Sequence, residues 1–223
     1  MRLLCRSPGR CAMASQRVEA AVAYGNLLTF SPDISAEEKS SILNVIAVAD
    51  MAASNMYDRD ESWTVWMHIY TQRLAAYGLQ RTSFITPESR VLGHPDDWAD
   101  ELFQIVGSYG SGQLAQMVRR CFSAARLNRT VSAFFDHSAV AGKGRFLQLA
   151  PCEKTAAGEV VVLMCGVYLS FNTDAVHVGG KRVILHVKGG RYVLNRDINQ
   201  GRRDELARYL GNRLEHVLSR ALV

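Results

Sequence analysis

The residues best suited to chemistry are the run Asp136, His137 and Ser138, which directly follows the aromatic pair Phe134-Phe135. An imidazole held by a carboxylate can serve as general base toward a nucleophile, and Cys121 or Ser138 could take the role of that nucleophile. The same run is also typical of a turn at a helix end, where Asp and Ser side chains bond to nearby backbone amides. Asp136, His137 and Cys121 are therefore candidate catalytic residues, although the pattern favours the turn.

A second group of candidate residues is aromatic. Trp63, Trp66 and Tyr70 fall on one face of a predicted helix. Such a stripe could line a pocket for an apolar ligand or lipid. At helical spacing it more often packs into a core, so the three are candidate ligand-binding residues with core packing as the favoured interpretation.

A third group is cationic. Arg202, Arg203 and Arg208 fall mainly on the polar side of a predicted C-terminal helix. The formal net charge is +5, and the excess of basic residues lies in residues 1–13 and 181–223. A basic end can attract phosphate, anionic lipid or an acidic partner. A solvated helix face is the favoured interpretation, and 26 basic residues are too few to favour nucleic acid as a partner.

The sequence offers no pattern for a metal or a dinucleotide cofactor. No two of the six histidines are three or four residues apart, and no Cys-x-x-Cys pair occurs among the five cysteines. Neither a nucleophile elbow nor a dinucleotide fingerprint after a strand is present. We therefore predict no metal and no cofactor, and we expect Cys121 and Cys165 to be buried core residues.

Helical signals dominate the first part of the chain. Ser15 is a cap for a predicted helix that runs to about Leu28, and Ser35 with Glu38 forms a capping box before a second helix. A Trp-rich helix is predicted to start at Asp58-Arg59-Asp60 and to end near Gly78. A short strand is predicted at Arg81–Ile85, followed by further helices after Pro95.

Strand signals dominate the second part. Residues 158–170 are apolar on both faces, which predicts a central strand covered on both sides. The pair Gly189-Gly190 predicts a two-residue hairpin between residues 181–188 and 191–194. Asn195 or Asp197 can cap a last helix, which Gly211 interrupts.

These elements predict an α+β protein, with N-terminal helices packed on a C-terminal antiparallel meander sheet that a terminal helix closes. We expect a disordered extension at 1–13 and a single domain at 14–223, helical over about 14–135 and sheet plus helix over about 140–223. No apolar run reaches the ~18 residues that a membrane span needs. The start lacks the apolar core of a signal peptide, so a soluble, cytoplasmic protein is expected, with export by a non-classical route as the alternative.

Two stretches carry a resemblance to known proteins: residues 44–78 (NVIAVADMAASNMYDRDESWTVWMHIYTQRLAAYG) and the close of the chain, with VVVLMCGVYLSF and YVLNRDINQGRRDELARYLG. Over roughly residues 40–80 and 140–223 they resemble a group of bacterial hypothetical proteins that is similar to the Erwinia virulence factor. That resemblance implies a compact α/β protein with a fatty acyl chain in thioester linkage to a cysteine. The resemblance assigns that cysteine to no position of this chain, so Cys121, Cys152 and Cys165 are the ones to examine.

The leading functional hypothesis is a non-catalytic bacterial virulence-type or accessory protein that binds an apolar ligand, a membrane surface or a protein partner. The resemblance adds a bound or covalent fatty acid. One alternative is a small hydrolase or transferase that uses Cys121 or Asp136 with His137. The other is a phosphate or nucleic-acid binder that uses the C-terminal arginines.

Overall fold

The computed structural model describes residues 19–23, 26–92, 98–109, 112, 114–117, 119, 145–172 and 182–211. The six described strands are β1 (Glu19–Ala23), β2 (Asn26–Phe30), β3 (Leu79–Leu92), β4 (Arg145–Lys154), β5 (Val160–Asn172) and β6 (Arg182–Leu194). The described residues also form the helices α1 (Ala36–Ser54), α2 (Trp63–Ala76), α3 (Trp98–Tyr109), α6 (Arg196–Gly201) and α7 (Arg203–Leu210).

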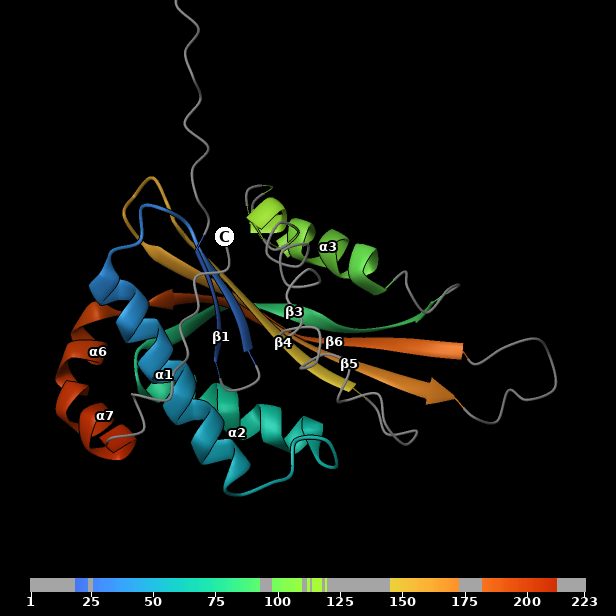
Figure 1. Cartoon of the computed structure of the whole chain (residues 1–223), viewed down its shortest axis with the longest axis horizontal. Helices are drawn as coiled ribbons and strands as arrows, with labels where there is room; N and C mark the ends of the chain where they lie inside the picture. Colours follow the sequence, from blue (N-terminus) through green and yellow to red (C-terminus); the bar gives the residue numbers. More distant parts are fainter. Residues whose placement is uncertain are drawn as a thin grey trace, which may run out of the picture.

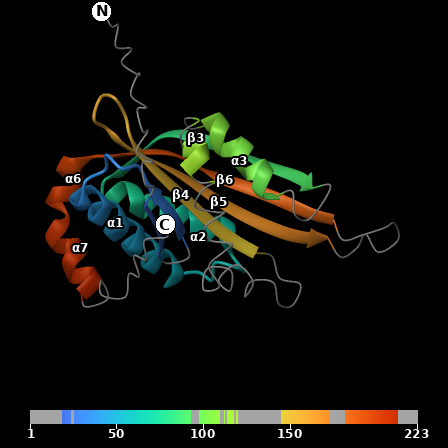
Figure 2. The same ribbon diagram turned by 45° about the horizontal axis from the view of Figure 1, so that its top comes forward.

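The strands form one sheet in the order β1-β2-β4-β5-β6-β3 (Figure 1). Helices α1 and α2 lie on one side of this sheet and α3 lies on the other, an arrangement that Figure 2 shows from a second direction. The prediction of an α+β protein is confirmed. Strands β4, β5 and β6 form the predicted antiparallel meander, but three strands from the N-terminal part extend it on both sides, and β2 pairs with β4 in parallel.

The helix predicted from Ser15 to Leu28 is wrong, because β1 and β2 form an antiparallel hairpin over most of that range. All five residues of β2 are buried, since the strand lies between β1 and β4. A short apolar run that is buried on both faces has no alternation in its sequence. Periodicity alone therefore cannot separate such a strand from a helix.

The short strand predicted at Arg81–Ile85 is the first half of a longer edge strand, β3. Its pairing with β6 shifts register between Ile85 and Glu88, where β3 carries one residue more than β6. Pro87 lies in this bulge, a position that a proline tolerates because it has no N–H to give to the ladder. The proline interrupts the sequence signal for a strand without ending the strand.

The hairpin predicted at Gly189-Gly190 is also wrong, since β6 runs through both glycines without a turn. A Cβ atom at Gly189 would lie 1.8 Å from the carbonyl oxygen of Met164, and one at Gly190 would lie 2.4 Å from that of Ser83. The two glycines therefore let the neighbouring strands β5 and β3 approach β6 closely, a role that the sequence does not distinguish from a turn.

The predicted capping box at the start of α1 is confirmed. The Ser35 hydroxyl accepts from the Glu38 amide, and the Glu38 carboxylate accepts from the Ser35 amide. Asn195 caps α6 by accepting from the Ile198 amide, and Gly211 with a φ of 48° follows the end of α7, as predicted. The sequence signals for these helix ends are local, so tertiary packing does not override them.

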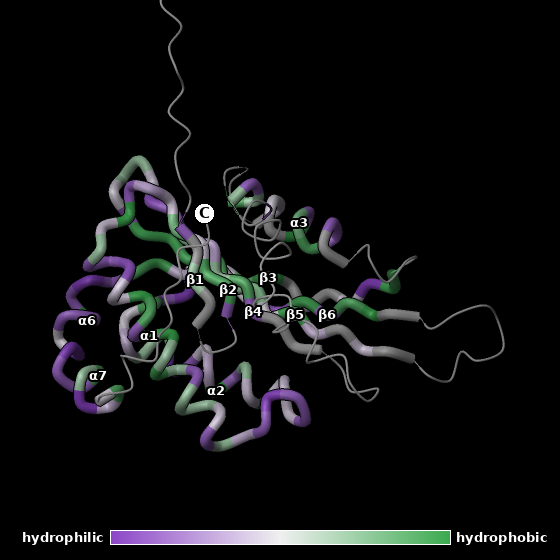
Figure 3. Tube along the Cα trace, in the orientation of Figure 1, coloured by the Kyte–Doolittle hydropathy of each residue, from purple (hydrophilic) through white to green (hydrophobic). Residues whose placement is uncertain are grey.

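The main core lies between the sheet and the helices α1, α2 and α7, and it draws on both the N-terminal and the C-terminal part of the chain. Apolar segments concentrate in the sheet and on the inner side of α1, whereas α6 and α7 are largely hydrophilic (Figure 3). Strand β5 has buried residues on both faces, which agrees with the central position predicted for it. Among the described helices, none has the length and hydropathy of a membrane span.

Candidate ligand-binding groove

A groove of about 460 Å³ lies between α2 and the strands β3 and β6. We call it the α2 groove. It is lined by Met67, His68, Thr71, Gln72, Ala75, Arg81, Phe84, Ile85, Lys188 and Gly189. Its volume is within the range of small-molecule sites in proteins.

Part of the lining of the α2 groove is apolar. Met67 and Ile85 are 1% and 2% exposed, whereas the Phe84 side chain is 64% exposed. The Met67 side chain lies 3.2 Å from the position that a Cβ would take at Gly166 on β5, so this glycine lets α2 lie close to the sheet. An exposed aromatic ring beside a buried apolar surface is favourable for contact with an apolar ligand.

Two cations border this apolar lining. The Arg81 guanidinium lies 3.8 Å from the centroid of the Phe84 ring, and Lys188 projects from β6. Among the residues whose side chains the structure describes, neither cation has a carboxylate within ion-pair distance. Burial raises the pKa of Tyr192, and the nearby positive charge of Arg81 acts in the opposite direction. The groove therefore combines apolar surface with two positive charges that no described carboxylate neutralises.

A second hollow, of about 850 Å³, lies between α1 and the helices α6 and α7, and we call it the polar cleft. Glu38 of α1 lines this cleft and connects α1 to β4 and α6. Its carboxylate accepts from Lys154 Nζ of β4 at 3.1 and 3.2 Å and from the Arg196 guanidinium of α6. Burial raises the pKa of Glu38, but the hydrogen bonds from Ser35, Lys154 and Arg196 outweigh it and lower this pKa to about 2.

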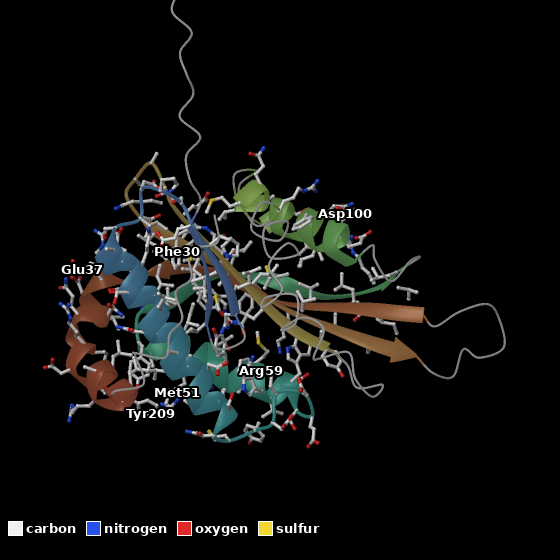
Figure 4. All side chains as sticks on the ribbon, in the orientation of Figure 1. Phe30, Glu37, Met51, Arg59, Asp100 and Tyr209 are labelled. Atoms are coloured by element: carbon white, nitrogen blue, oxygen red, sulfur yellow. The ribbon has the colours of Figure 1, made fainter. Side chains whose placement is uncertain are left out.

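The arginines proposed from the sequence as an anion site lie beside the polar cleft and have acidic neighbours. Arg202 donates to Glu205 at 2.8 Å, and a guanidinium nitrogen of Arg203 lies 3.8 Å from the carboxylate of Glu37. Arg208 donates to the Asp204 carbonyl oxygen. Figure 4 labels Glu37 on α1, the helix that faces α6 and α7. Anion binding by these three arginines stays a prediction. The neighbouring carboxylates of Glu205 and Glu37 offset part of their positive charge.

The aromatic candidates lie on α2, where the sequence placed them. Trp66 and Tyr70 are 0% exposed and their rings stack 4.8 Å apart in the core. The Arg59 guanidinium covers the Trp66 ring and pairs with Asp50 at the point where α1 passes into α2, and Arg59 is labelled in Figure 4. Trp63 is partly buried and stacks on Tyr168 of β5. Neither Trp66 nor Tyr70 offers surface to a ligand in this structure.

The candidate catalytic residues Cys121, Asp136 and His137 lie outside the described residues. Cys152 and Cys165 are fully buried. Burial raises the pKa of the Cys165 thiol to about 12 and raises that of Cys152 further. A buried thiol that holds its proton is a poor nucleophile, so neither cysteine is poised for reaction in this structure.

The residues that form the α2 groove were not singled out from the sequence as a site. Arg81, Phe84 and Lys188 come from two strands about a hundred residues apart, which pair only in the folded sheet. The alternation around Lys188 indicates that Lys188 and His186 share one face of their strand. The sequence gives no sign that β3 and α2 lie against that face.

Comparisons with known proteins give one distant similarity. No protein-family model matches the sequence, and no curated protein matches it. The solved structure of the Evf virulence factor is similar over 94% of this chain and 89% of that chain, with a TM-score of 0.44 and 11% sequence identity. The chain is therefore distantly similar in structure to a virulence factor, and this similarity identifies neither a ligand nor an activity.

Proposed function

We propose that this protein is a binding protein whose ligand is an amphipathic anion, an aliphatic chain that carries a carboxylate or a comparable acidic group. The α2 groove carries the proposal, because it places the exposed Phe84 ring beside Arg81 and Lys188, two cations with no ion-pair partner among the described carboxylates. A medium-chain fatty acid has an aliphatic chain for the apolar side chains and a carboxylate for the cations.

The apolar part of such a ligand would supply most of the affinity. Each methylene group that leaves water contributes about 0.8 kcal/mol, whereas an ion pair at an exposed cation contributes about 0.2–1 kcal/mol. Part of this gain offsets the loss of ligand freedom on binding. We therefore expect affinity to rise with chain length until the groove is full, and the cations to set the orientation.

Displacement of a fluorescent fatty acid tests the proposal. The protein is titrated with cis-parinaric acid, and the bound probe is then displaced with decanoate or with decanol. Decanoate is expected to displace the probe at lower concentration than decanol does, because only the acid meets Arg81 and Lys188. Equal displacement by the two compounds would remove the charged half of the proposal.

A matched pair of α2 variants tests where the ligand lies. Ala75 is exposed and lines the groove, whereas Ala76 is exposed and does not line it. Ala75→Trp is expected to fill the groove and weaken parinarate binding at least tenfold, while Ala76→Trp leaves it unchanged. Full binding by A75W, in a protein with an unaltered circular dichroism spectrum, would overturn the proposed function.

A further inference from the structure

A hydroxyl–imidazole–hydroxyl cluster crosses three strands at one end of the sheet. Nδ1 of His186 on β6 lies 2.8 Å from the Ser89 hydroxyl oxygen of β3, and its Nε2 lies 3.0 Å from the Ser170 hydroxyl oxygen of β5. Ser89 and His186 are directly paired across the two strands. In a neutral imidazole one ring nitrogen donates and the other accepts, so a serine is available to each role.

Aromatic rings hold this imidazole in place. The centroid of the Tyr168 ring lies 5.9 Å from that of the His186 ring, and the Trp63 ring of α2 stacks on Tyr168 at 5.8 Å. The His186 side chain is half-buried beside these aromatic rings, whereas Ser89 is exposed on the edge strand β3. Burial lowers the pKa of His186, which keeps the ring neutral and able to accept a proton near pH 7.

We propose that Ser89 is a nucleophile for acyl transfer, with His186 as its general base and Ser170 as the residue that positions the imidazole. An exposed hydroxyl within hydrogen-bond reach of an imidazole, itself held by a third group, is the arrangement that activates a serine. This pair is distinct from the Cys121 and Asp136–His137 candidates.

The reaction balances without any further reactant except water. The Ser89 Oγ attacks the carbonyl carbon of an ester while its proton passes to Nδ1 of His186. The tetrahedral intermediate then expels the alcohol, which takes that proton, and the acyl group stays on Ser89. Water attacks the acyl-serine with the same imidazole as base, which releases the acid and restores the hydroxyl.

The substrate class follows from the neighbouring groove, and in this respect the inference rests on the proposed function. Lys188 is two residues from His186 on the same face of β6, about 7 Å along the strand. An acyl chain in the α2 groove would place its carbonyl end toward the cluster. Lys188 then supplies positive charge near the developing oxyanion. The expected substrates are esters of medium-chain aliphatic acids.

Covalent labelling tests the nucleophile directly. A fluorophosphonate probe phosphonylates an activated serine with loss of fluoride, and peptide mass spectrometry then locates the label. We expect the label on Ser89 and its absence in Ser89→Ala. Ser83→Ala is the matched control, since Ser83 is exposed on the same strand and has no hydrogen bond to His186. An unlabelled wild-type protein, or a label retained by S89A, would overturn the inference.

The roles of His186 and Ser170 have separate readouts. His186→Gln is expected to slow labelling at least about a hundredfold, the lower range of general base catalysis. Ser170→Ala is expected to lower kcat for p-nitrophenyl decanoate about tenfold with KM unchanged, because a misplaced base affects the chemical step. Ser170→Thr should restore kcat. An effect of S170A on KM alone, or failure of the threonine to restore kcat, would remove Ser170 from the proposal.

The A75W variant separates this inference from the proposed function. If both hold, A75W loses hydrolysis of p-nitrophenyl decanoate but keeps that of p-nitrophenyl acetate and keeps the label on Ser89. A label on Ser89 together with unchanged parinarate binding by A75W would refute the groove and the substrate class, and would support the nucleophile. Groove binding without a labelled serine would refute the nucleophile alone.

Discussion

The polar cleft and the α2 groove use similar side chains in opposite ways. At the polar cleft, Glu38 pairs with Arg196 and also with Lys154 of β4, so these charges connect α1 to β4 and α6. In the α2 groove, Arg81 and Lys188 stand beside apolar surface without a described carboxylate partner. The cations at the larger hollow are therefore neutralised by Glu38, whereas those at the smaller hollow have no described carboxylate partner.

The largest effect is expected from the backbone beneath the α2 groove. Gly189→Ala would place a Cβ 1.8 Å from the Met164 carbonyl oxygen, so β5 and β6 would have to separate. We expect a loss of about 3 kcal/mol or more in the free energy of unfolding, at the upper end for overpacked interiors. Urea denaturation followed by tryptophan fluorescence measures it.

The matched control for that variant lies beside the polar cleft. Gly201 on α6 has nothing within 4 Å of a Cβ and no positive φ. Gly201→Ala should therefore leave stability unchanged or raise it by about 0.5–1 kcal/mol, because alanine loses less backbone entropy in a helix. If G189A and G201A lost similar free energies of unfolding, the close approach of β5 to β6 would not be the reason for a glycine at position 189.

The second effect concerns the polar cleft. Glu38→Gln removes the charge that Lys154 and Arg196 share, and we expect a loss of about 2 kcal/mol in the free energy of unfolding near pH 7. The Glu38 pKa is lowered from 4.5 to about 2, so its contribution is present above about pH 4.5 and is lost as the pH falls toward 2. Urea titrations across that window measure this dependence.

Two outcomes separate a scaffold role for Glu38 from a ligand role. The E38Q protein should lose the acid dependence between pH 4.5 and 2 and should bind cis-parinaric acid as the wild-type protein does. A weakened affinity for the probe in a fully folded E38Q sample would contradict the contrast between the two hollows, since Glu38 lines only the polar cleft.

Local signals predicted the fold where neighbours in sequence decide the structure. Ser35 and Glu38 cap each other, Asn195 caps α6, and β5 is apolar on both faces because it is central. Predictions were wrong where a distant strand decides. Strand β2 is buried on both sides by β1 and β4, and Gly189-Gly190 serves the approach of β5 and β3 rather than a turn.

The α2 groove was harder to predict from the sequence than the fold. Trp66 and Tyr70 have the spacing of either a core or a pocket, and only the packing of α2 on the sheet distinguishes them. The sequence alone does not distinguish the environment of Lys188 from that of Lys154. They differ because Glu38 of α1 reaches one of them and no described carboxylate reaches the other.

The smallest expected effect is the sharpest test of that difference. Lys188→Gln removes a charge without a described ion-pair partner, so the free energy of unfolding should change by no more than about 0.5 kcal/mol. Binding of decanoate should weaken by up to about fivefold, the value of one exposed ion pair, while binding of decanol stays the same. Arg208→Gln on α7 is the control and should alter neither. A K188Q protein that loses stability but keeps its preference for decanoate would mean that Lys188 belongs to the scaffold, as Lys154 does.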